Sequence, residues 1–294
     1  MKKYIYRINK LLVRLMRKNA CINSNLYIVV ENKGTLRELV NETHARKVTR
    51  LTVTGLLNGS DIDYIHNSFP ELRELDLSCC IISAGEFRCS VHKHIQEIKA
   101  DRVAPHMFHI EKLISLTLPF STTDLYLNNM WGTGAFINSL EKINISEKSV
   151  LYSSLNGILY DKARKALLKA APAVKTVVIP KGVNLISKGS FKDCIALRSV
   201  SVPDTVNYIG DYAFENCRSL RVLHLPRSLV HTGILPFGKN IMLSDIYCAA
   251  EIPPEVFDYP LDTGVCRLHV PYGTRTVYSG APFWKYFKYI DETE

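Results

Sequence analysis

Three consecutive segments of 23 residues, 174–196, 197–219 and 220–242, repeat one pattern without a gap. Proline and phenylalanine recur in register in every segment, as Pro180, Pro203 and Pro226 and as Phe191, Phe214 and Phe237. A period of about 20–29 residues that opens with apolar residues in an L-x-x-L-x-L pattern is typical of a leucine-rich repeat, in which each repeat forms one coil of a stack. The pattern therefore predicts a repeat solenoid of short parallel β-strands, one per coil.

The middle segment shows how one coil is built. Leu197, Val200 and Val202 are apolar and are separated by polar residues, which is the pattern of a short strand with one buried side. Pro203 ends the strand because proline has no N–H to donate to the ladder. Phe214 then fills the far side of the coil. A single unit of this kind cannot bury its own apolar face, so the coils are expected to stack.

The same strand pattern recurs on both sides of the regular segments and predicts about nine or ten coils in total. The further strands are expected at residues 48–53, 72–77, 95–98, 113–118, 140–145, 243–248 and 266–270. Between residues 156 and 170, two apolar runs flank a polar turn at 161–164, which predicts a hairpin inserted into one coil. The solenoid is therefore expected to span residues 26–270.

The two ends of a solenoid need covers for their outermost apolar faces. At the N-terminal end, Leu36, Leu39 and Val40 lie on one face of a helix expected over residues 35–43, which predicts a helical N-cap. At the C-terminal end, residues 271–294 are rich in aromatic side chains and predict an aromatic C-cap. Its inward residues are expected at helical spacing, as Val277, Ala281, Trp284 and Phe287 or Lys288.

These segments resemble the BspA-like leucine-rich repeat family, a group common in Bacteroidetes. The resemblance rests on the repeat at 197–220, the inserted segment 156–172 and the ending 268–290, and with the opening from Gly34 it covers residues 26–294. It implies a secreted or surface-exposed protein that binds other proteins or surfaces. It does not imply an enzyme.

The positive charge is concentrated in the first twenty residues. The chain has 37 Lys and Arg against 28 Asp and Glu, a net charge of +9. Residues 1–20 contribute +7 of this, from Lys2, Lys3, Arg7, Lys10, Arg14, Arg17 and Lys18, and contain no acid, so the remaining residues carry +2. A nucleic-acid-binding surface is a basic patch on the folded domain, so no nucleic-acid partner is expected.

Residues 1–25 are interpreted as a separate basic amphipathic segment. Its apolar residues fall on one helical face, as Tyr4, Ile5, Ile8, Leu11, Leu12, Leu15 and Met16. Three interpretations stay open. The segment is a degenerate export signal whose apolar stretch is interrupted by Lys10 and Arg14, or a peripheral helix on a membrane surface, or a terminal helix docked on the fold.

Catalytic and cofactor motifs are scarce, so the sequence predicts no enzyme and no cofactor. The densest histidines are His92, His94, His106 and His109, but no carboxylate or cysteine stands at a metal-finger or zincin spacing beside them. Gly59-Ser60-Asp61-Ile62-Asp63 suggests calcium but lacks the long ligand loop. A helix that starts there, capped by Ser60 or Asp61, is the preferred interpretation.

The eight cysteines are better explained by packing than by a disulfide framework. Cys194 and Cys217 hold the same position one coil apart, where a small buried residue is wanted. Cys248 occupies an inward strand position. If a disulfide forms, the pairs to test are Cys248–Cys266 and Cys194–Cys217.

The exposed side of the strands is the predicted binding surface. Its outward residues form two columns, and the candidates for partner contact are Thr176, Val178, Ser199, Ser201, Val222, His224, Asp245 and Tyr247. A near-neutral face of this kind suits a protein partner. The expected function is protein–protein interaction or adhesion by a monomer at the cell surface or after secretion. The alternatives are an intracellular or membrane-surface scaffold docked through residues 1–20, and a glycan-binding module that uses Trp284, Tyr286 and Tyr289.

Overall fold

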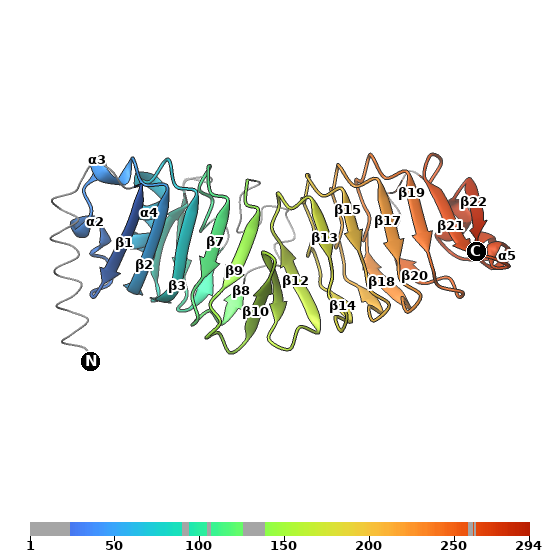
Figure 1. Cartoon of the computed structure of the whole chain (residues 1–294), viewed down its shortest axis with the longest axis horizontal. Coiled ribbons are helices and arrows are strands. Elements are labelled where there is room, and N and C mark those ends of the chain that lie inside the picture. Colours follow the sequence, from blue (N-terminus) through green and yellow to red (C-terminus); the bar gives the residue numbers. More distant parts are fainter. Residues whose placement is uncertain (1–23, 90–93, 105–106, 126–138, 258–260, 262) are drawn as a thin grey trace.

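The chain is an elongated stack of coils in which successive strands pair in parallel (Figure 1). The computed structural model describes residues 24–89, 94–104, 107–125, 139–257, 261 and 263–294. β1 lies at one end of the stack and β22 at the other. The apolar side chains form two core clusters that meet where β10, β11 and β12 enter the stack.

The N-terminal coils share one five-stranded parallel sheet. Its strands, in spatial order, are β1 (Asn25–Val30), β2 (Arg50–Leu57), β3 (Glu74–Ile82), β7 (Ser115–Leu118) and β9 (Lys142–Ile145). β1 was not predicted, and it places one further coil before the first expected strand. In each strand the alternate side chains are buried, as Leu75 and Leu77 are in β3.

The C-terminal coils continue the strands along the same side of the stack (Figure 1). They are β13 (Thr176–Val178), β15 (Ser199–Ser201), β17 (Val222–Leu225), β19 (Asp245–Cys248), β21 (Arg267–Pro271) and β22 (Tyr289–Thr293). β13 pairs with β15 in one sheet, and β17, β19, β21 and β22 pair in that order in another. Thr176 is paired with Ser199 and Val222 with Asp245, each 23 residues apart, so the strand register equals the sequence period.

A second sheet of seven strands covers the returning side of the C-terminal coils. Its strands are β10 (Tyr152–Leu155), β11 (Ile158–Asp161), β12 (Ala166–Ala170), β14 (Leu185–Ile186), β16 (Tyr208–Ile209), β18 (His231–Ile234) and β20 (Glu255–Phe257). β11 and β12 form the predicted antiparallel hairpin, and β10 adds an unpredicted third strand to it. β12 then pairs in parallel with β14, so the hairpin starts this second sheet.

The N-terminal coils return differently. The helix α4 (Gly59–Ser68) connects β2 to β3, and the pairs β4 (Gly85–Cys89) with β5 (His94–Ile98) and β6 (Arg102–Val103) with β8 (Asp124–Leu125) follow. The prediction of a coil strand at 95–98 is wrong, because β5 pairs antiparallel with β4 in a hairpin outside the main sheet. A membrane-spanning helix needs about 20 apolar residues, and no helix in the described ranges is long and apolar enough for that.

The segment predicted as an N-terminal helix consists of two single turns. They are α2 (Leu36–Leu39) and α3 (Glu42–Ala45), and Val40 between them is extended. Leu36 and Val40 are buried but Leu39 is 45% exposed, so the three residues do not share one apolar face. The break follows from the Asn41 side chain, which accepts a hydrogen bond from the backbone N–H of His44 and starts a new helix there.

The C-terminal aromatic segment packs against the core and then rejoins the sheet. α5 (Arg275–Gly280) buries Tyr278, whereas Val277 is 54% exposed, so the prediction of an inward Val277 is wrong. Trp284 and Phe287 are buried as predicted. A short 3-10 helix, η1 (Trp284–Tyr286), follows. The rings of Phe283, Trp284 and Phe287 are buried against one another, with ring centroids 4.9–5.9 Å apart. β22 comes after them and pairs with β21, which the sequence did not predict.

The regular coils stack through a ladder of phenylalanine rings. Phe191 and Phe214 lie 4.9 Å apart between centroids with a 6° angle between ring planes, and Phe237 lies 6.4 Å from Phe214. All three are buried. Each coil therefore buries its ring between the rings of its neighbours.

Phe214→Ala is expected to lower the free energy of unfolding by about 3–5 kcal/mol, because it empties the middle of this ladder. Ser199→Ala is the matched control on an exposed strand position, and its cost is expected below about 0.5 kcal/mol. Equilibrium denaturant unfolding of both variants measures the difference. Equal costs would contradict the assignment of inward and outward positions.

Gly210→Ala is expected to destabilise the stack by about 1–3 kcal/mol through overpacking. A Cβ atom at Gly210 would lie 2.5 Å from the backbone nitrogen of Lys188 in the preceding coil. Gly280→Ala is the control, since nothing lies within 4 Å of its added Cβ, and it should leave stability unchanged or raise it by up to about 1 kcal/mol. Thermal unfolding compares the two; a neutral Gly210→Ala would mean that the coils separate freely there.

Candidate functional site

The predicted outward columns lie side by side on the solvent side of β13, β15, β17, β19, β21 and β22, which we call the strand face. Thr176 is paired with Ser199 and Val178 with Ser201, and these four side chains are exposed. In the next sheet Val222 is paired with Asp245 and His224 with Tyr247. His224 is exposed, while Val222, Asp245 and Tyr247 are half-buried. The role of these residues in binding stays a prediction.

Both columns continue beyond the residues that the sequence singled out. β21 adds Arg267 and His269, and β22 adds Tyr289 and Asp291. The signal was present in the sequence as a spacing of 22 residues from Asp245 to Arg267 and again to Tyr289. It was missed because the C-terminal segment was interpreted as a cap, without a strand.

Three rings of the second column stack along the strand face. The centroids of His224 and Tyr247 are 4.7 Å apart, and those of Tyr247 and His269 are 4.1 Å apart, with interplanar angles of 18° and 7°. Because the rings lie nearly parallel, their faces cover one another and their edges are left for solvent. The stack therefore offers ring nitrogens and a hydroxyl to a partner in preference to a flat aromatic face.

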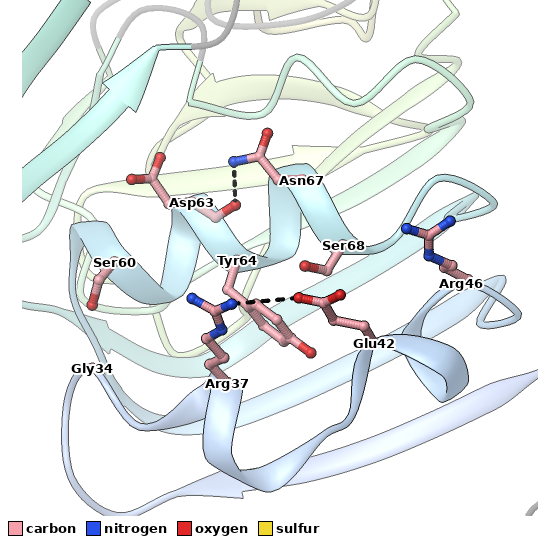
Figure 2. Close-up of a pocket in the computed structure, with 9 residues that line it drawn as sticks. All are labelled: Gly34, Arg37, Glu42, Arg46, Ser60, Asp63, Tyr64, Asn67 and Ser68. Atoms are coloured by element: carbon pink, nitrogen blue, oxygen red, sulfur yellow. Dashed lines mark hydrogen bonds and ion pairs between the residues drawn. The ribbon is translucent and has the colours of Figure 1, made fainter.

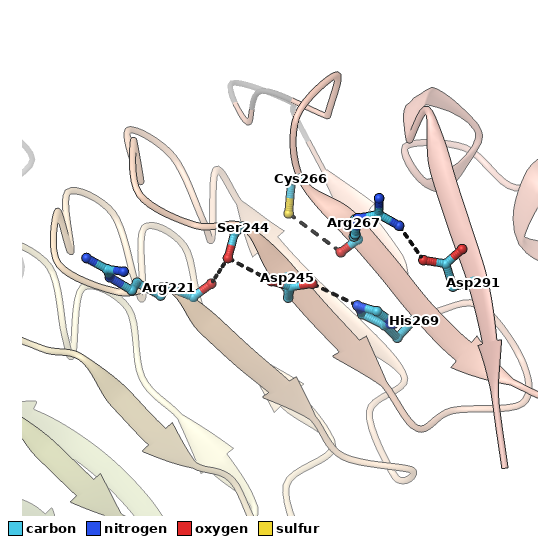
Figure 3. A network of polar contacts seen from close by, with 7 residues as sticks. All are labelled: Arg221, Ser244, Asp245, Cys266, Arg267, His269 and Asp291. Carbon is cyan, nitrogen blue, oxygen red and sulfur yellow. Dashed lines mark hydrogen bonds and ion pairs between the residues drawn. The ribbon is translucent and has the colours of Figure 1, made fainter.

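A polar network fixes the C-terminal end of the strand face (Figure 3). His269 Nε2 lies 2.8 Å from Asp245 Oδ1, and Ser244 Oγ lies 2.7 Å from Asp245 Oδ2. The hydrogen bond with His269, followed by that from Ser244, holds the pKa of Asp245 below its ordinary value. Beside it, Arg267 forms an ion pair of 3.1 Å with Asp291. These polar groups therefore satisfy one another within the fold.

The aromatic residues proposed for glycan stacking do not form one platform. Trp284 is fully buried, and its indole Nε1 donates to the carbonyl oxygen of Pro254 at 2.7 Å. Tyr286 and Tyr289 are exposed, but Arg267 lies 5.0 Å from the Tyr289 ring centroid and Lys288 lies 5.3 Å from it. The Trp284 part of that hypothesis is therefore wrong, because the C-terminal core needs the largest ring in its interior.

The stretch considered for calcium is a helix start. Asn58 is the N-cap of α4 and Asp61 its third residue, so the cap is Asn58 and not Ser60 or Asp61. The Asp61 carboxylate is buried and accepts backbone N–H bonds from Gly34 at 2.6 Å, Leu36 at 3.0 Å and Asn58 at 3.0 Å. All its acceptor capacity is directed at the backbone, so Asp61 is a structural residue that joins two coils.

A polar cleft of about 510 Å³ lies where α2, α3 and α4 meet (Figure 2). It is lined by Gly34, Arg37, Glu42, Arg46, Ser60, Asp63, Tyr64, Asn67 and Ser68. Arg37 pairs with Glu42 at 3.4 Å, and the Tyr64 hydroxyl donates to the carbonyl oxygen of Val40 at 2.6 Å. The cleft brings together no nucleophile with a general base, and its groups serve local structure.

Most of the histidine group considered for a metal is not described, so that hypothesis is not tested. His92 and His106 lie outside the described residues, and so do the basic residues 1–20. Among the side chains that are described, no three of His, Cys, Asp and Glu gather as metal ligands.

The cysteines considered for disulfides are free thiols. Cys194, Cys217, Cys248 and Cys266 are all buried, and no disulfide joins either proposed pair. Burial raises the pKa of Cys194 to about 12 and that of Cys217 well above its ordinary value. Cys217 Sγ donates to the carbonyl oxygen of Phe191 at 3.1 Å, which makes it a packing residue with a satisfied donor.

His269→Phe is expected to raise the pKa of Asp245 toward the ordinary aspartate value of about 3.9, because it keeps the ring stack and removes the hydrogen bond. With a lowered pKa, Asp245 contributes stability above its ordinary pKa that is lost as pH falls through the lowered value. The variant should therefore lose less stability on acidification. Carboxyl NMR titration of Asp245 measures the shift; His224→Phe is the control and should cause none. An equal shift of the Asp245 pKa in both variants would mean that the ring stack, and not the hydrogen bond with His269, lowers this pKa.

Comparison with known proteins finds a family match for part of the chain. The BspA type leucine-rich repeat region matches residues 164–259 in six copies, and no curated protein matches the chain. The chain is similar to a leucine-rich repeat protein from Eubacterium ventriosum (16% identity, 77% of this chain and 67% of that one, TM-score 0.48). It is also similar to the pneumococcal vaccine antigen PcpA, with 13% identity over 84% of this chain and 72% of that one and a TM-score of 0.42. A leucine-rich repeat protein from Bacteroides ovatus matches with 15% identity over 84% of this chain and 61% of that one and a TM-score of 0.39. The match to the BspA type leucine-rich repeat therefore falls on the segment from β12 through β20, which is less than half of the chain.

Proposed function

We propose that this chain is a non-catalytic binding protein that contacts another protein through the strand face. The observation that carries the proposal is the end of this face formed by β13 and β15, where exposed side chains stand in register on paired strands. Val178 is 70% exposed between the hydroxyl groups of Thr176 and Ser201. An apolar group among short hydroxylated side chains gives a partner both contact area and hydrogen bonds at little cost in side-chain entropy.

Charge and shape favour a protein over other partners. Outside residues 1–20 the chain carries +2, which is too little for a nucleic-acid surface that must neutralise several phosphates. The stacked rings of the strand face present edges, so a sugar ring finds no aromatic face to stack on there. A single copy presents the whole face, so the functional unit is proposed to be a monomer.

The proposed location is the cell surface or the medium, where the partner is a host or bacterial surface protein. The family of the repeat region supports this location. The competing proposal is an intracellular or membrane-surface scaffold that docks through the basic residues 1–20. The two proposals differ in whether the strand face meets its partner outside the cell or inside it.

Site-specific photo-crosslinking in the source organism tests the proposal. A benzophenone amino acid replaces Ser199 on the strand face, or Asn207 on the opposite side of the same coil as the control, since both side chains are exposed. Irradiation is expected to give a discrete protein adduct from position 199 and none from position 207. Equal adducts from both positions, or none from either, would contradict binding through the strand face.

Protease treatment of the intact, irradiated cells separates the two locations. Loss of the adduct is the expected result and supports a surface partner. Survival of the adduct, together with an N-terminal peptide that begins at Met1, would contradict the surface location and favour the scaffold docked through residues 1–20.

A further inference from the structure

Three basic side chains form a row along one border of the strand face. Lys175, Arg198 and Arg221 each directly precede a strand, at the same position of three successive coils. All three are exposed. The backbone N–H of Arg198 donates to the carbonyl oxygen of Lys175 at 2.8 Å, and β15 contacts β17. The three residues are therefore neighbours across the stack; we call them the basic row.

The cations of the basic row have no internal counterpart. Within the described ranges, none of the three forms a salt bridge, whereas the acids of the surrounding coils are engaged elsewhere. Glu215 pairs with Lys192 at 2.6 Å and Lys239 at 2.9 Å, and Asp245 is held by His269. In Figure 3 the guanidinium of Arg221 extends away from Ser244 and Asp245, outside that network.

The other face residues of these coils complete an amphipathic surface. Next to the basic row stand Thr176, Ser199 and Val222, and beyond them Val178, Ser201 and His224. From the border inward, the first column is thus cationic, the second carries two hydroxyl groups and one valine, and the third carries a valine, a serine and a histidine. A partner segment that matches this order has an acidic edge beside a face of small apolar residues.

The spacing of the row selects the conformation of that segment. Adjacent strands lie about 4.8 Å apart, so the three cations repeat at that interval along the stack axis. Residues on one face of an α-helix, three or four positions apart, are about 5–6 Å apart. Alternate residues of an extended strand are nearly 7 Å apart, since each residue rises about 3.4 Å. The side-chain spacing of a helix that lies along the stack axis therefore matches the spacing of the three cations better than that of an extended peptide does.

We propose that the basic row and the adjoining strand face bind an amphipathic α-helix of a partner protein that carries a line of Glu or Asp side chains. The proposal rests on the proposed function and names the chemistry of its partner. The acidic edge of the helix pairs with Lys175, Arg198 and Arg221, and its apolar side covers Val178 and Val222.

Peptide binding to the full-length protein tests the proposal. The probe is an alanine-rich helical peptide of about 20 residues with glutamates in one line, and its isomer has the same residues with the glutamates distributed around the helix. The test variant is Lys175→Gln/Arg198→Gln/Arg221→Gln. The control variant is Lys165→Gln/Lys181→Gln/Arg227→Gln, which removes three exposed cations that lie outside the row.

The aligned peptide is expected to bind, and fluorescence anisotropy should show a loss of about tenfold in affinity in the test variant, as the sum of three exposed ion pairs predicts. The control variant should stay within about twofold of the wild type. Binding should weaken between about 0.1 and 1 M salt, over which the screening length falls from about 10 to about 3 Å.

Three outcomes would overturn the proposal. They are equal binding of both peptide isomers, equal weakening in both variants, or no binding of the aligned peptide at about 0.1 M salt. If heparin binds more tightly than the aligned peptide and the test variant loses heparin binding, the row would be assigned to an acidic polysaccharide. The crosslinking experiment at position 199 does not depend on these peptides. If it gives an adduct while the aligned peptide does not bind, the proposed function is retained and the acidic helix is rejected.

Discussion

Each regular coil of this chain buries its apolar side chains only against the coil before and the coil after it. The contact between Phe191 and Phe214, 4.9 Å between ring centroids, recurs one period later with Phe237. Parallel pairing fixes the same 23-residue register on the strand side. Because ring and strand share one period, an insertion inside a coil would break both at once. The chain places its inserted β10–β11 segment before the regular coils, where no phenylalanine ladder has begun.

The features predicted from the sequence are those that the period itself encodes. The positions of the main-sheet strands β2, β3, β7, β9, β13, β15, β17, β19 and β21, the burial of Phe214 and the outward columns all follow from one alternation repeated in register. The interpretation of Cys194 and Cys217 as packing residues rests on the same repeat, and both are buried free thiols. Periodicity thus predicts both the buried and the exposed side of every regular coil.

The features that the sequence did not reveal depend on pairings between distant residues. β5 has the alternation of a coil strand, but its partner is the antiparallel β4. β22 follows a segment that interrupts the strand pattern with α5 and η1, and it is its pairing with β21 that returns it to the sheet. Asp61 looks like a calcium ligand in sequence, and only the approach of Gly34 and Leu36 directs its oxygens to backbone N–H groups. In each case tertiary contacts decide among local patterns that are equally consistent with the sequence.

The two ends of the strand face differ in how their polar groups are satisfied, and this difference favours one end as the proposed binding region. At the C-terminal end, His269 with Asp245 and Arg267 with Asp291 are paired across adjacent strands. A partner there would have to displace bonds that already exist, and it would gain little in exchange. At the other end, over β13, β15 and β17, Thr176, Ser199 and the basic row stand beside exposed Val178. None of the three cations forms a salt bridge among the described residues, so a partner carboxylate can pair with them without breaking an internal ion pair. The same repeat therefore provides one end whose polar groups stabilise the stack and an opposite end that suits the proposed partner.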